Sequence, residues 1–125
     1  MSDAAVAFDR FLDTDAPAVA DIARALRATV LELMPDAIES FDAPDRLLAF
    51  GVGAGRRDFL FAIIPHTAYV NLQLADGALL ADPDGRIEGT GKRVRHVKVR
   101  SVDDSRSAWL RAVVERQVAI RLPGR

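Results

Sequence analysis

The chain has 125 residues, with 17 basic and 18 acidic side chains and a net charge of −1. This length suits one domain, and a content of 50% hydrophobic residues excludes a disordered chain. The balanced charge gives no overall field that would attract nucleic acid or an anionic membrane. Cysteine is absent, which excludes disulfides, thiolate catalysis and cysteine-ligated metals and fits a reducing compartment.

The first ten residues contain no basic segment, and no apolar run reaches the length of a bilayer span. The sequence therefore predicts a cytoplasmic protein without a membrane anchor.

Apolar residues at helical spacing predict two helices at the start of the chain. The first covers Ala4 to Asp13, and the second runs from about Pro17 to Met34. Pro35 ends the second helix, because the residue before a proline avoids helical backbone angles. Asp15 is the expected N-cap of this helix.

The pattern then changes to short alternating runs separated by turn-forming residues, which predicts an antiparallel meander of four strands. The runs are Ala37 to Asp42, Leu47 to Val52, Asp58 to Ile64 and Tyr69 to Leu74. In the last run, Val70, Leu72 and Leu74 point to one side, so we expect one face of the sheet to be buried under helices.

A long connection over residues 76–91 leads to a fifth predicted strand at Arg93 to Arg100. Ser101 to Ser105 is expected to cap a last helix from about Arg106 to Leu122. The sequence thus predicts a single α+β domain over residues 1–125. Its helices pack on one face of a five-stranded, mainly antiparallel sheet, in the order α-α-β-β-β-β-β-α.

The fifth predicted strand carries a dense basic run. If Val97 and Val99 point into the core, Arg95 shares their face and needs a carboxylate partner or a bound anion. One interpretation of the run is an edge strand that its charges protect from pairing with other chains. The alternative is a strand that follows the phosphates of a nucleic acid, which the aromatic content of 6% disfavours because few rings are available for stacking.

The residues before that strand combine glycine amides with a lysine, and such a loop can hold a carboxylate or phosphate without catalysing a reaction. We expect a ligand-binding site here, formed by Gly89, Thr90, Gly91, Lys92, Arg95, His66, His96 and Tyr69. No serine lies in a nucleophile elbow, and the two histidines lack the spacing of metal ligands. The sequence therefore assigns no catalytic residue, no metal ligand and no cofactor.

The same region resembles the YdhG-like family, a bacterial domain family of largely unknown function. The likeness covers most of the chain. Its residues are Pro65-His66, Tyr69-Val70-Asn71-Leu72, Glu88-Gly89-Thr90-Gly91-Lys92 and Arg95-His96-Val97-Lys98. The resemblance implies a two-layer α+β fold and brings no established set of catalytic residues. Some members are labelled frataxin-like iron chaperones.

Two functions follow as hypotheses. The first is a non-catalytic binding module for a small anionic ligand or partner group near residues 89–92. The second is an intracellular iron chaperone, which would present carboxylate oxygens on the early helices. Those helices carry Asp3, Asp9, Asp13, Asp15 and Asp21, with Arg10, Arg24 and Arg27 interspersed. The sequence leaves open whether the chain forms a homo-oligomer.

Overall fold

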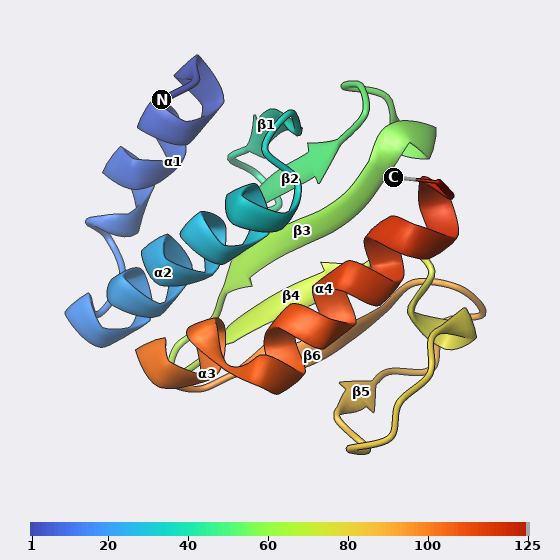
Figure 1. Cartoon of the computed structure of the whole chain (residues 1–125). Helices are drawn as coiled ribbons and strands as arrows, with labels where there is room; N and C mark the ends of the chain where they lie inside the picture. Colours follow the sequence, from blue (N-terminus) through green and yellow to red (C-terminus); the bar gives the residue numbers. More distant parts are fainter. Residues whose placement is uncertain (125) are drawn as a thin grey trace.

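Over residues 1–124, four α-helices lie on one face of a six-stranded antiparallel sheet, and no helix covers the opposite face (Figure 1). This computed structural model describes residues 1–124. The helices are α1 (Asp3–Leu12), α2 (Pro17–Leu33), α3 (Val102–Arg106) and α4 (Ala108–Arg121). The strands are β1 (Ile38–Asp42), β2 (Leu47–Gly51), β3 (Phe59–Pro65), β4 (Val70–Leu74), β5 (Ile87–Glu88) and β6 (Arg95–Val99). Two short 3-10 turns, η1 (Arg56–Asp58) and η2 (Gly77–Leu79), precede β3 and follow β4.

The predicted α+β class and the placement of the helices on one face are confirmed, but the strand number is wrong. The strand order is β1-β2-β3-β4-β6-β5, so the short β5 covers the outer side of β6. Ile87 pairs with Val97, and Glu88 pairs with His96. The interpretation of the basic run as an edge strand is therefore also wrong. Two residues are too few for alternation to reveal a strand.

Two expectations at helix ends are wrong as well. Ala16 occupies the N-cap of α2 without a side-chain hydrogen bond, and Asp15 instead accepts a hydrogen bond from Arg46 at 2.9 Å. Pro17 starts the helix without a backbone N–H that would need a partner. The predicted last helix corresponds to α4, but the segment expected only to cap it forms the separate short helix α3, which Ser101 caps and Ser107 ends.

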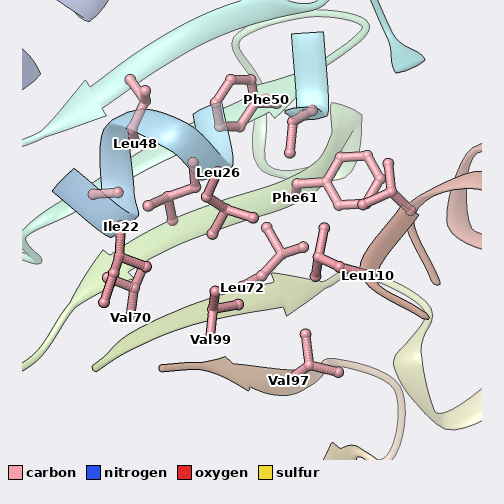
Figure 2. Close-up of a cluster of buried hydrophobic side chains, with 14 of the residues drawn as sticks. Ile22, Leu26, Leu48, Phe50, Phe61, Val70, Leu72, Val97, Val99 and Leu110 are labelled. Carbon is pink, nitrogen blue, oxygen red and sulfur yellow. The ribbon is translucent and has the colours of Figure 1, made fainter. Parts of the chain in front are cut away.

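The core lies between the helices and the inner face of the sheet (Figure 2). As the alternation predicted, Val70, Leu72 and Leu74 of β4 are buried, and so are Val97 and Val99 of β6. Ile22, Leu26 and Leu110 cover them from the helices. Each such side chain contributes about 1.5–3 kcal/mol by burial. Asn71 and Gln73 of β4 and His96 and Lys98 of β6 lie on the other face of the sheet, which is named the open face below.

Candidate functional site

Alternation along β6 divides the predicted site residues between the two faces of the sheet. Arg95 pairs with Leu74 on the helix side, whereas His96 pairs with Gln73 on the open face. Successive side chains of a strand point in opposite directions. Arg95 and His96 therefore do not contact one ligand together.

Arg95 stabilises the loop that precedes β6. Its Nε donates a hydrogen bond to the carbonyl oxygen of Gly91 at 3.1 Å. A Cβ at Gly91 would lie 2.4 Å from the carbonyl oxygen of Val94, so the loop turns too tightly for any other residue there. Lys92 and Thr90 are exposed, and within residues 1–124 the Lys92 ammonium has no hydrogen bond or ion pair.

The two ends of the predicted site are also far apart along the β4–β6 ladder. The Leu74–Arg95 pair and the Val70–Val99 pair are four residues apart, which corresponds to about 13 Å. Gly91 and Lys92 lie beyond the first pair, whereas His66 and Tyr69 lie beyond the second. The structure thus does not bring Lys92 to His66 and Tyr69.

His66 and Tyr69 form a cluster with two residues of the open face. Their rings stack with centroids 4.9 Å apart, and the Lys98 Nζ lies 5.0 Å from the centroid of the Tyr69 ring. The Asn71 side-chain amide lies 3.1 Å from the His66 Nε2. Pairing across the ladder sets Asn71 beside Lys98. His66 and Tyr69 are among the predicted site residues, and alternation on β4 and β6 places Asn71 and Lys98 together on the open face.

The electrostatic environment of His66 is positive. Partial burial lowers the pKa of His66, and the charges of His96, Arg46 and Lys98 lower it further. Neutral imidazole is therefore the favoured form, with one ring nitrogen free to accept a hydrogen bond from Asn71.

A polar hollow of about 370 Å³ adjoins Lys98. We name it the basic hollow, and its lining residues are Asp84, Gly85, Arg86, Glu88, Lys98 and Arg100. The Lys98 Nζ lies 3.8 Å from Glu88 Oε1, and the Arg86 guanidinium also stacks over the Trp109 ring at 4.1 Å.

Gly89 connects the basic hollow to the glycine loop. Its φ of +117° is a conformation that side-chain-bearing residues rarely adopt. A Cβ built there would lie 3.6 Å from His96 Nδ1. Of the loop's residues, Gly89 is thus the one that the structure places next to a histidine of the open face.

The sequence analysis missed a buried ion network on the helix side. Asp76 accepts hydrogen bonds from Arg93 Nε at 2.5 Å, from Gln117 Nε2 at 2.7 Å and from Arg121 at 3.0 Å. Arg93 therefore has the carboxylate partner that we expected for Arg95. No local pattern could reveal this network, since Arg121 is 45 residues away from Asp76 in the chain.

The acidic residues of the early helices are largely paired with arginines. Asp9 and Asp13 both bind Arg24, and Asp15 binds Arg46. In the part of the chain that the structure describes, no group of three or more histidine, aspartate or glutamate side chains could hold a metal ion.

Comparisons with protein-family models, with curated proteins and with solved structures each find no match to this chain. The resemblance to the YdhG-like family stays a prediction. Over residues 1–124, no helix is both long enough and apolar enough to cross a membrane.

Proposed function

We propose that the protein is a non-catalytic binding module that holds a small anionic group, such as a phosphate or carboxylate, in the basic hollow beside Gly89. The observation that carries this proposal is that Arg86, Lys98 and Arg100 all line one hollow beside β5 and β6. Two carboxylates, Asp84 and Glu88, line the same hollow, so three positive charges face two negative ones.

Two of the three cations that line this hollow, Arg100 and Lys98, have at most weak partners among the residues that the structure describes. The Arg100 side chain has no hydrogen bond or ion pair among the residues that the structure describes. The Lys98–Glu88 pair is long at 3.8 Å and solvent-accessible, and such pairs are worth about 0–1 kcal/mol. A phosphate oxygen can accept hydrogen bonds from both cations at once, and charge-assisted hydrogen bonds are among the strong ones.

The histidines act from outside the basic hollow. Neither His66 nor His96 lines it, so no side chain with an ordinary pKa near neutrality lies in direct contact with the bound anion. His66 and Tyr69 hold Lys98 at the open face, and the loop of Thr90, Gly91 and Lys92 shapes the approach to Gly89. We therefore propose that the hollow binds an anion without catalysing a reaction. As the sequence analysis expects, we propose that the module acts in the cytoplasm.

A titration with inorganic phosphate at constant ionic strength, followed by the amide NMR signals, tests the proposal. We expect saturable shifts at millimolar phosphate and an affinity about fivefold weaker in Lys98→Gln, the equivalent of about 1 kcal/mol. Lys92→Gln is the matched control, because it removes the same charge from an exposed lysine at the other end of β6, and its affinity should be unchanged. If phosphate causes no saturable shift, or if only Lys92→Gln weakens binding, the proposed site is wrong.

The iron chaperone remains a prediction of the resemblance. The pairing of Asp9, Asp13 and Asp15 with arginines gives it no support in the geometry.

A further inference from the structure

A second hollow of about 340 Å³ lies over β1 to β4 on the open face. Its floor is a row of cross-strand neighbours in the order Ser40, Ala49, Ala62 and Gln73. The two central residues are alanines, so the floor is low between two longer polar side chains. The hollow therefore has a short apolar centre with hydrogen-bonding groups on both sides.

The first wall of this hollow is the β1–β2 turn, which presents Asp42 and Asp45. The Asp42 Oδ1 accepts a hydrogen bond from the Asp45 backbone N–H at 3.2 Å, so the two residues are held together. Arg46 has a φ of +56° and is anchored by its hydrogen bond to Asp15. This hydrogen bond fixes the wall to the segment between α1 and α2.

The second wall is the β2–β3 loop, which presents Ala54 and Arg56. A Cβ at Gly51 would lie 2.3 Å from the carbonyl oxygen of Asp58, so glycine lets this loop approach the sheet closely. The Asp58 carboxylate accepts a hydrogen bond from the Gly55 backbone N–H at 3.2 Å. The loop that carries Arg56 is thus held by its own contacts.

The two walls carry opposite charge. Within residues 1–124, the side chains of Asp45 and Arg56 have no hydrogen bond or ion pair. β2 runs from one wall to the other, and Leu47 and Gly51 at its ends are about 13 Å apart. Both charged residues line the hollow.

We propose that this hollow, named the dipolar hollow, binds a short peptide with free termini. The peptide's ammonium group pairs with Asp42 and Asp45, its carboxylate pairs with Arg56, and small side chains lie over Ala49 and Ala62. An extended peptide of three to four residues spans about 10–14 Å, which is comparable to the roughly 13 Å between the ends of β2. Complementary charge at both ends fixes its orientation. This inference does not rest on the proposed anion site, which uses other residues.

Titration with tri-alanine, followed by amide NMR signals, tests the inference with chemically capped peptides as comparators. Wild type should bind tri-alanine with saturable shifts at Ala49 and Ala62, and both N-acetylation and C-amidation of the peptide should weaken binding at least threefold. Arg56→Gln should cause the same loss as C-amidation, and amidation should cost nothing further in this variant. Asp45→Asn should cause the same loss as N-acetylation of the peptide, and N-acetylation should cost nothing further in this variant.

Arg57→Gln is the matched control, since Arg57 is the neighbour of Arg56 in η1 but does not line the hollow. It should leave the affinity unchanged, as should Lys98→Gln. The inference is overturned if tri-alanine gives no saturable shift, or if capping either terminus leaves the affinity as it was. It is also overturned if Arg57→Gln weakens binding as much as Arg56→Gln.

Discussion

Replacing Asp76 with alanine removes a carboxylate that ties three distant parts of the chain together. Asp76 is 1% exposed and accepts hydrogen bonds from Arg93, Gln117 and Arg121. These partners belong to the loop before β6 and to α4. The Asp76→Ala variant should therefore be destabilised without any change in the hydrophobic core.

The size of the loss depends on how accessible to water each partner of Asp76 is once the carboxylate is removed. Gln117 is fully buried, so its amide loses an acceptor where water cannot replace it, at a cost of about 1–3 kcal/mol. The side chains of Arg93 and Arg121 are 62% and 27% exposed and regain water, so each ion pair contributes about 0.2–1 kcal/mol. Together these losses amount to about 3 kcal/mol.

Urea unfolding followed by the fluorescence of Trp109 measures this loss. Asp9→Ala is the control, because Asp9 also pairs with an arginine at 2.7 Å but its side chain is 50% exposed. We expect the control to lose less than about 1 kcal/mol. Equal losses in the two variants would refute the argument that burial of Gln117 determines the cost.

Acid provides a second test of the same network. Burial by itself would raise the pKa of Asp76, but hydrogen bonds from Gln117, Arg121 and Arg93 outweigh it and lower the pKa below its usual value near 3.8. The stabilisation is therefore complete above that value and is lost as the pH falls through the lower pKa of the folded state. Wild type should lose stability in this range more steeply than Asp76→Ala.

Three further changes test other parts of the fold. Burial and nearby positive charges lower the pKa of His66, so the unfolded chain takes up a proton at a higher pH than the folded protein. Wild type should therefore lose stability as the pH falls from 6.5 through the lower pKa of the folded state. The urea midpoint of His66→Gln should depend less on pH in this range. Gly51→Ala should cost about 1–3 kcal/mol, because the new Cβ would overlap the backbone of Asp58, and an unchanged midpoint would contradict the close approach. Thr29→Val should cost about 1 kcal/mol, because it removes the 2.7 Å hydrogen bond from the Thr29 hydroxyl to the Ser105 carbonyl oxygen. A Tm equal to that of wild type would contradict this expectation.

Local periodicity explains why much of the fold could be predicted. The alternation of Val70, Leu72 and Leu74 determines which face of β4 is buried, and the helical spacing of Ile22 and Leu26 does the same for α2. These patterns depend only on neighbours in the chain. β5 could not be predicted, since its existence depends on pairing with β6 rather than on its own two residues.

The candidate site could be predicted only in part. Alternation along β6 already separates Arg95 from His96, and the sequence could have excluded a shared site on that ground. The partner of Arg93 could not be predicted, because Asp76 is brought to it by the long connection after β4. The hollows depend on which strands are neighbours, such as Ala49 beside Ala62, and on where the loops fold over the sheet.

Selective isotope labelling of lysine tests the central claim, that anions bind on the open face rather than at the glycine loop. Lys92 and Lys98 are the two lysines of the chain, so the labelled protein gives one amide signal for each location. During a phosphate titration at constant ionic strength, we expect the Lys98 signal to shift and saturate while the Lys92 signal stays in place. A saturable shift at Lys92 with a stationary Lys98 signal would contradict the account.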